Sequence, residues 1–267
     1  MAQRSHVRPT RAAEFRFYEE LNDFLPAERR KVAFMYPFQG TPAVRDAIQA
    51  IGVPHSAVDL VLVDGRSVDF AHRLRGGERV AVYPVFERLD ISPLLRLRPL
   101  PLRRTRFILD VHLGKLARFL RLLGLDCAYG PDWDDAAIID RAVAEQRIIL
   151  TRDVGILKQV RVTHGYWVRS DQPDAQLEEI VGAFDLRRQL RPFSRCLECN
   201  GAIRPVDRAS LDGQIGADVL GRFERFWQCR ECRRVYWQGS HYRRLVQRVR
   251  QVVPDPPPSE VHGEPGA

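Results

Sequence analysis

Two apolar stretches of the chain each end on an aspartate. Residues 106–110 read RFILD and residues 147–153 read RIILTRD, so Asp110 and Asp153 follow predicted buried strands. The core of a sheet does not require a carboxylate there, whereas ligands of parallel sheets bind beyond the C-terminal ends of the strands. The two acids are therefore candidate catalytic or metal-binding residues.

A third carboxylate is predicted at the same sheet edge. Asp134 and Asp135 open the segment 134–146, which predicts a helix whose first-turn acids suit its positive N-terminus. Carboxylates brought so close repel each other, and Mg²⁺ or Mn²⁺ with oxygen ligands would offset the repulsion. Such a cation lowers the pKa of a bound water and stabilises an in-line phosphoryl displacement. The alternative is that single acids, notably Asp134 or Asp153, only cap helices; for the three together we favour a site.

Basic residues lie near these acids. Lys115, Arg118 and Arg121 recur every three residues along a predicted helix whose other side is apolar, so we expect a solvated basic face. Lys115 is the exception, because it lies one turn from the first strand-end acid and could hold a scissile phosphate. Arg152 precedes the second strand-end acid and could either orient the phosphate or pair with a surface carboxylate on the opposite face.

Four of the five cysteines form two CxxC pairs, Cys196 with Cys199 and Cys229 with Cys232. Paired CxxC motifs predict a tetrahedral Zn²⁺ site with four thiolate ligands. A closed site of four cysteines leaves no position for a water, so this zinc is predicted to be structural. The fifth cysteine, Cys127, is expected to be a buried thiol.

Residues 186–253, which contain both cysteine pairs, are rich in arginine, with 15 Arg against 6 acidic residues. Aromatic residues alternate with arginine around the second pair, in RFERFWQCRECRRVYWQGSHYRRL. Rings interleaved with guanidinium groups are typical of surfaces that bind single-stranded nucleic acid. The alternative is a solvated, compositionally biased surface, with some of the rings packed in a small core beneath the zinc.

The N-terminal part of the chain predicts an α+β unit of the β-grasp kind. The segment TPAVRDAIQAIG predicts a helix with Thr41 as its N-cap, Pro42 at its first position and Gly52 as its stop. VDLVLVDGRSVDF predicts two strands joined by an Asp-Gly turn, and RGGERVAVYPVF predicts a last strand.

The middle of the chain alternates strands and helices, which predicts an α/β fold with a parallel sheet and helices on both faces. No apolar run approaches the ~18 residues of a membrane helix, and the N-terminus lacks a signal-peptide core. We therefore expect a cytoplasmic protein without a membrane partner. The predicted segments are a flexible N-terminus (1–13), the β-grasp domain (14–90), a linker (91–104), the α/β domain (105–188), a zinc ribbon (189–250) and a disordered acidic, Pro-rich tail (251–267).

Several stretches carry a family resemblance. FILDVHLGKLARFLRLLGLD, DDAAIIDRAVAEQRIILTRD, SRCLECN and CRECRRVYWQGSHYRRL resemble the Mut-seven C-terminal RNase domain family, across residues 14–246 together with the N-terminal unit. That family joins a PIN-like RNase to a zinc ribbon, and some members carry an N-terminal domain similar to ubiquitin and the sulfur carriers. Sulfur carriers end in a free Gly-Gly tail, whereas Gly76 and Gly77 are internal here. A binding role is therefore expected for this domain rather than a carrier role.

The resemblance implies a PIN-like fold and a metal-dependent ribonuclease, with Asp110, Asp135 and Asp153 as the acids that hold Mg²⁺ or Mn²⁺. Asp135 is preferred over Asp134 because it begins the matching DAAII stretch, which leaves Asp134 as a cap or spare ligand. PIN nucleases often use a fourth acid, and Asp171 is a candidate because it follows the fourth strand.

The expected function is hydrolysis of RNA by an endonuclease, with the β-grasp domain binding a protein partner or extending the RNA surface. The alternative is a non-catalytic adaptor that binds RNA or protein through the ribbon and the ubiquitin-like domain. Neither the RNA substrate nor the oligomeric state is predicted.

Overall fold

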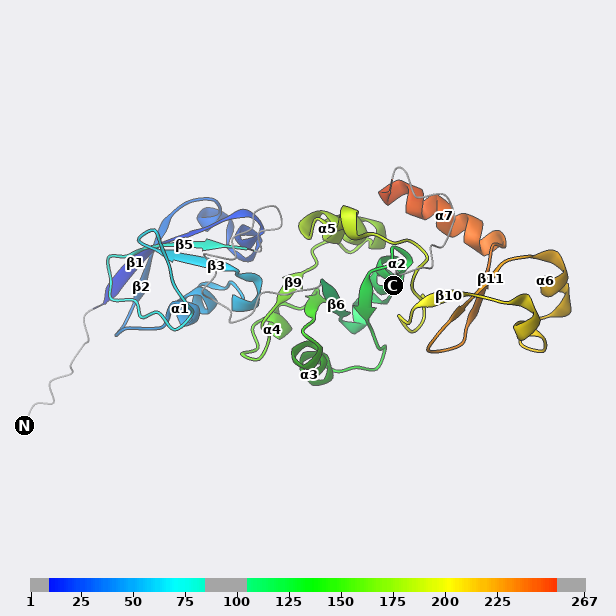
Figure 1. Cartoon of the computed structure of the whole chain (residues 1–267). Coiled ribbons are helices and arrows are strands. Elements are labelled where there is room, and N and C mark those ends of the chain that lie inside the picture. The colour runs from blue at the N-terminus through cyan, green and yellow to red at the C-terminus, as the bar shows by residue number, and fades with distance from the viewer. Residues whose placement is uncertain (1–9, 85–104, 254–267) are drawn as a thin grey trace, which may run out of the picture. The chain divides into compact units, whose positions relative to one another are not determined.

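The computed structural model describes residues 10–84 and 105–253 (Figure 1). The predicted linker (91–104) lies outside the described residues, as do most of the predicted N-terminal segment (1–13) and tail (251–267). Among the described residues, no helix combines the length and apolar character needed to cross a membrane.

The N-terminal domain is a five-stranded mixed sheet, in the order β2-β1-β5-β3-β4, with one α-helix. Strand β1 is antiparallel to β2 and parallel to β5, which is the arrangement of a β-grasp domain. The buried face of the helix joins the phenylalanines of β1 in one core, so the prediction of a β-grasp domain is confirmed. The elements are β1 (Arg11–Phe17), η1 (Glu19–Phe24), η2 (Ala27–Arg29), β2 (Phe34–Phe38), α1 (Val44–Ile51), η3 (His55–Ala57), β3 (Leu60–Val63), β4 (Arg66–Ser67) and β5 (Arg79–Tyr83).

The start of α1 differs from the prediction. The helix begins at Val44 with Ala43 in the N-cap position, so Thr41 is not its cap and Pro42 is not its first residue. Ala43 is held in an extended conformation by a bridge to Arg73, and the Val44 N–H donates to a carbonyl 28 residues away, that of His72, at 2.8 Å. A distant loop therefore provides the cap. The predicted stop is confirmed, because Gly52 ends the helix with a φ of 121°.

The α/β domain contains a four-stranded sheet in the order β7-β6-β8-β9, in which β6 is parallel to β7 and β8 is parallel to β9. Helices flank the sheet, and α2 packs against α5 (Figure 1). The predicted parallel sheet flanked by helices is confirmed. The elements are β6 (Arg106–Leu109), η4 (Val111–Leu113), α2 (Gly114–Leu122), β7 (Asp126–Ala128), α3 (Asp135–Glu145), β8 (Ile148–Thr151), α4 (Val154–Leu157), β9 (Gly165–Trp167), α5 (Pro173–Ala183) and η5 (Leu186–Gln189).

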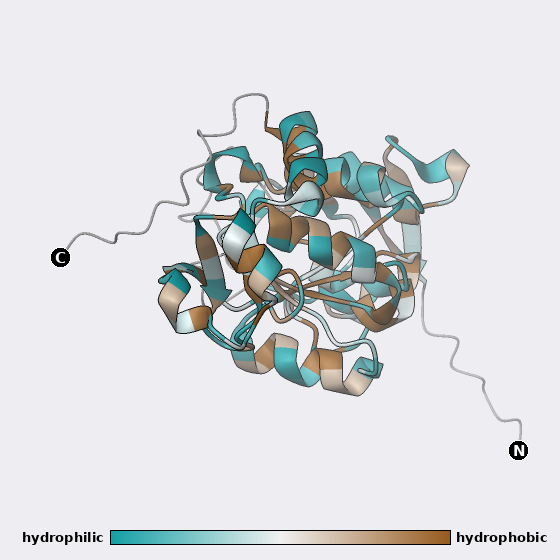
Figure 2. Cartoon of the chain, turned by 90° about the vertical axis from the view of Figure 1, so that its right-hand side faces the viewer, coloured by the Kyte–Doolittle hydropathy of each residue, from teal (hydrophilic) through white to brown (hydrophobic). Residues whose placement is uncertain are grey.

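The C-terminal ribbon is a three-stranded antiparallel sheet, β10-β11-β12, followed by a helix. Hydrophobic and hydrophilic residues alternate along the helices (Figure 2), and in the last helix only Val249 and Val252 are buried. The elements are β10 (Ile203–Val206), η6 (Arg208–Leu211), α6 (Ala217–Arg222), β11 (Phe226–Cys229), β12 (Val235–Trp237) and α7 (Ser240–Val252).

Candidate metal centre and acidic sheet edge

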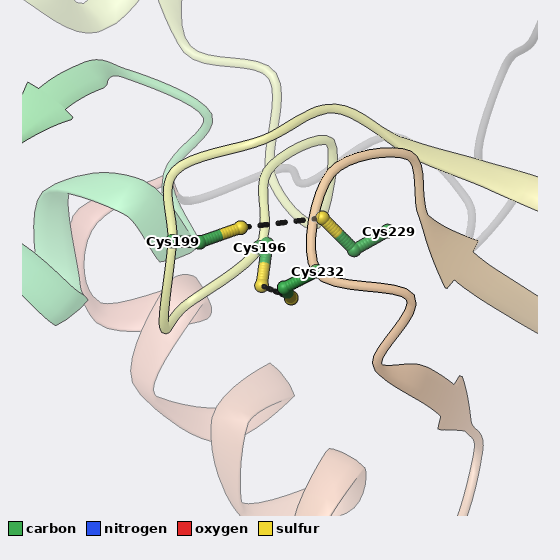
Figure 3. A group of neighbouring side chains, drawn as sticks. All are labelled: Cys196, Cys199, Cys229 and Cys232. Atoms are coloured by element: carbon green, nitrogen blue, oxygen red, sulfur yellow. Dashed lines mark hydrogen bonds between the residues drawn. The ribbon is translucent and has the colours of Figure 1, made fainter.

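The two CxxC pairs lie on two turns with the same hydrogen bonds. In the first turn, the Asn200 N–H donates to the Cys196 carbonyl at 3.0 Å; in the second, the Arg233 N–H donates to the Cys229 carbonyl at 3.2 Å. Each donor directly follows the second cysteine of its pair and adopts a positive φ, 70° for Asn200 and 61° for Arg233. The reversed chain makes the four cysteine side chains point toward one another (Figure 3).

The spacing of the sulfurs fits a four-coordinate metal. All four Sγ atoms lie within 4.8 Å of one another. Cys196 and Cys232 are separated by 3.5 Å and Cys199 and Cys229 by 3.4 Å, close to the about 3.8 Å expected for tetrahedral Zn–S bonds of ~2.3 Å. The cluster can therefore hold a structural metal such as zinc.

The cysteines of the cluster differ in acidity. Burial raises the pKa of the Cys196 thiol, but hydrogen bonds from the Tyr236 hydroxyl (3.0 Å) and from backbone N–H groups outweigh burial and lower it to about 7. Burial raises the pKa of Cys229, and it raises that of Cys232 to about 12. A cation is therefore needed to deprotonate these two thiols, and binding of the metal would release protons.

The first turn is attached to the α/β domain by a buried arginine. Arg121 of α2 is 3% exposed and donates from Nε to the Cys127 carbonyl at 2.9 Å. Its Nη1 donates to the carbonyls of Leu197 (3.1 Å) and Glu198 (2.7 Å), the two residues between the first pair of cysteines. The prediction that Arg121 belongs to a solvated basic face is therefore wrong, because the ribbon covers this side of α2.

Asn200 attaches the same turn to the outer strand of the sheet. Its Oδ1 accepts the Cys127 N–H at 3.0 Å, and its Nδ2 donates to Asp126 Oδ1 at 2.8 Å. Arg195 adds an ion pair with Asp126 at 3.3 Å. Strand β7 is the end of the sheet, so Asn200 completes its hydrogen bonding from outside. Asn200 was not predicted as a functional residue; its signal in the sequence is a residue tolerant of positive φ directly after a CxxC motif. Cys127 is fully buried, as predicted.

The three predicted acids lie at the start of helical segments or the end of strands. Asp110 directly follows β6 and is only 6% exposed. Asp135 is the first residue of α3, and Asp153 lies two residues beyond β8; both are exposed. Among the described residues, the four cysteines are the one group of three or more Cys, His, Asp or Glu side chains placed to hold an ion.

The capping role foreseen as the alternative applies to two aspartates. Asp153 Oδ1 accepts the Gly155 N–H at 2.6 Å and caps α4, and Asp134 Oδ1 accepts the Ala137 N–H at 2.8 Å. A carboxylate has about four acceptor sites, so one capping bond leaves Asp153 able to bind a second group.

The remaining predicted site residues are on the surface. Lys115 lies in the first turn of α2, Arg152 immediately precedes Asp153, and Asp171 lies four residues beyond β9; all three are exposed. The loop before Asp171 is fixed by Glu179 of α5, which accepts the Arg169 and Ser170 N–H groups at 3.1 and 3.3 Å. Glu179 was not foreseen, because its contacts join residues that are ten positions apart.

The chain is thus a multidomain α/β protein, with a parallel sheet flanked by helices, a preceding β-grasp domain and a following four-cysteine ribbon. The family model described as the Mut7-C RNAse domain matches residues 105–249, and that described as Mut7-C ubiquitin matches residues 10–90. The first match covers more than half of the 267 residues, so the chain belongs to the Mut7-C RNase domain family. No curated protein and no solved structure matches the chain.

Proposed function

We propose that the chain is a metal-dependent ribonuclease that cleaves RNA internally. The observation that carries the proposal is Asp110, a carboxylate that is 94% buried at the end of a sheet strand within a segment that matches the RNase family model. A buried carboxylate is costly unless its environment compensates it, and such residues concentrate at functional sites.

In this proposal Asp110, Asp135 and Asp153 bind one Mg²⁺ or Mn²⁺, with Asp171 or Asp134 as a candidate fourth ligand. The bound cation would supply a water of lowered pKa for attack on the phosphodiester. Lys115 and Arg152 would neutralise the scissile phosphate as point charge and planar donor, respectively. The acids' own chemistry is thus to hold the cation, while the two basic residues orient the substrate.

The four-cysteine cluster would hold Zn²⁺ with a structural role, since four thiolates leave no coordination site for a reacting water. The ribbon would guide RNA toward the acids, and the β-grasp domain would bind a protein partner or extend the RNA surface. The family match supports RNA as the substrate class.

The test uses purified full-length protein and labelled RNA, with Mn²⁺, with Mg²⁺, or with no added divalent cation. Asn caps a helix about as well as Asp, so Asp153→Asn removes the charge and keeps the cap of α4. We expect Asp110→Asn, Asp135→Asn and Asp153→Asn to lose cleavage by more than a hundredfold (on the order of 3 kcal/mol or more in the barrier), with folding retained. The exposed neighbour Asp132→Asn is the matched control and should cleave like wild type.

The rival function is a non-catalytic adaptor that binds RNA or protein. The capping bond of Asp153 favours it, because that bond already gives the residue a role without a metal. Cleavage by wild type and by Asp153→Asn at the same rate would indicate a contaminant. RNA binding by both proteins without any cleavage would establish the adaptor.

A further inference from the structure

A cavity of ≈ 330 Å³ lies between α2, the ribbon strands β11 and β12, and the first turn of α7. All of its lining residues belong to one compact unit of the fold. The cavity shares no lining residue with the proposed set of acids. It is therefore a separate feature from the proposed cleavage site.

The walls of the cavity are largely aromatic. Trp227 is a buried part of the lining. Tyr236 also lines the cavity, and its hydroxyl bonds to Cys196 Sγ at 3.0 Å. Trp237 and Tyr242 also line the cavity, and both are half-buried. The wall that includes Tyr236 is thus fixed to the metal-binding turn.

The polar part of the lining is predominantly cationic. Arg118, Arg195 and Arg234 contribute guanidinium groups, against one acid, Glu198. Arg118 is paired with Glu198 at 2.8 Å, and Arg195 is held by the Asn200 carbonyl at 2.9 Å. The guanidinium of Arg234 is exposed and forms no hydrogen bond or ion pair with any described residue. A net positive charge at an aromatic cavity favours an anionic ligand with a planar ring.

We infer that this cavity binds one unpaired nucleotide of an RNA strand, with its base against the half-buried rings and its phosphate at Arg234. The volume falls at the lower end of small-ligand pockets, which span about 300–1,000 Å³. Aromatic stacking accepts any base, and arginine pairs with the phosphate. A base in a duplex is already stacked and cannot enter, so the site selects single-stranded segments.

The cavity also has a defined relation to the acids along α2. Arg118 lines the cavity, and Lys115, the candidate phosphate ligand, lies three residues earlier and so on a neighbouring position of the same helix face. A strand held at the cavity can therefore run along α2 toward Asp110, and the bound nucleotide flanks the scissile bond. The choice of RNA as the ligand rests on the proposed ribonuclease function. The existence and lining of the cavity are observed independently of that proposal.

The test measures binding of a fluorescein-labelled single-stranded oligouridylate to full-length protein by anisotropy, without added divalent cation, so that no cleavage is needed. We expect Arg234→Ala and Trp237→Ala each to weaken binding about tenfold, the loss typical of one stacked base or one phosphate contact. Trp237→Phe keeps a ring and should stay within about threefold of wild type. Arg230→Ala is the matched control, because Arg230 is exposed beside Cys229 but does not line the cavity.

Metal content and thermal unfolding of each variant separate loss of the site from loss of the fold; Arg234→Ala removes an exposed side chain and should leave both unchanged. Binding is measured without cleavage, so failure of the proposed acids would leave the binding losses of Arg234→Ala and Trp237→Ala in place, whereas failure of the cavity would remove those losses. The inference is overturned if Arg234→Ala binds like wild type, if Arg230→Ala loses as much as Arg234→Ala, or if duplex RNA binds as tightly as the single strand.

Discussion

The two cysteine turns are alike in backbone and different in surroundings. Both use the same hydrogen bond onto the first cysteine's carbonyl and the same positive φ after the second cysteine. The first turn is hydrogen-bonded to the α/β domain: Arg121 of α2 donates to its carbonyls, and its own Asn200 accepts from the backbone of β7. The second turn has exposed arginines, Arg230 and Arg233, where the first has the buried Leu197 and the half-buried Asn200. One metal-binding motif thus anchors the ribbon to the α/β domain, while its duplicate leaves side chains available for a ligand.

The largest loss of stability is expected at the four-cysteine cluster, because each turn contributes two of its four metal ligands. Cys229→Ser leaves three thiolates, so the protein should lose its metal and the ribbon should unfold, since structural zinc supplies on the order of 10 kcal/mol in small domains. Elemental analysis and thermal unfolding measure both effects. The buried thiol outside the cluster gives the control: Cys127→Ala should retain the metal. A folded, metal-loaded Cys229→Ser protein would contradict the four-ligand site.

A smaller effect should distinguish the anchored turn. Arg121→Met leaves the carbonyls of Leu197 and Glu198 without their donor, and we expect a loss of about 3 kcal/mol in the free energy of unfolding. The exposed pair of Arg118 with Glu198 contributes at most about 1 kcal/mol, so Arg118→Ala is the comparison. Urea unfolding measures both variants. If both variants lost the same free energy of unfolding, the buried Arg121 would stabilise the ribbon no more than the exposed pair of Arg118 with Glu198 does.

The smallest and most specific effect concerns the two residues of positive φ. Glycine adopts this conformation freely, so Asn200→Gly and Arg233→Gly relieve the backbone equally. Asn200→Gly also removes the bonds to Cys127 and Asp126 and should destabilise the protein by about 1–2 kcal/mol. Arg233→Gly should be neutral or stabilising by up to about 1 kcal/mol. The two turns would be equivalent after all if both variants shifted the urea midpoint in the same direction by the same amount.

Sequence patterns within a few residues correctly predicted the features that depend only on short segments. The CxxC spacing identified the four-cysteine cluster, and runs such as RFIL and RIILT identified buried strands, because each signal lies within a few residues. The beginning of α1 could not be read in this way, since its first N–H groups bind carbonyls of a distant loop. The burial of Arg121 beneath the ribbon could not be predicted either. Helical periodicity indicates which residues share a helix face, but not which later segment packs on that face. Strand β2 was overlooked: Pro37 interrupts its pattern, which an edge strand tolerates.

The acids illustrate a different limit. Sequence placed Asp110 at the end of a strand, and the structure has it there and buried. The sequence left open that Asp153 caps a helix, but it did not define that helix, because α4 has four residues and is too short to show periodicity. Whether a carboxylate serves a cap, a cation or both depends on charges and ligands that the spacing of residues does not encode.

The contact of Asn200 with β7 has a consequence for the behaviour of the protein in concentrated solution. An end strand whose outward N–H groups are unsatisfied is a template for strand addition by another molecule. Here one asparagine, held in place by the metal-binding turn, occupies that position. A metal bound by the four cysteines would fix this turn and its asparagine, so removal of the metal would uncover the Cys127 N–H to another molecule.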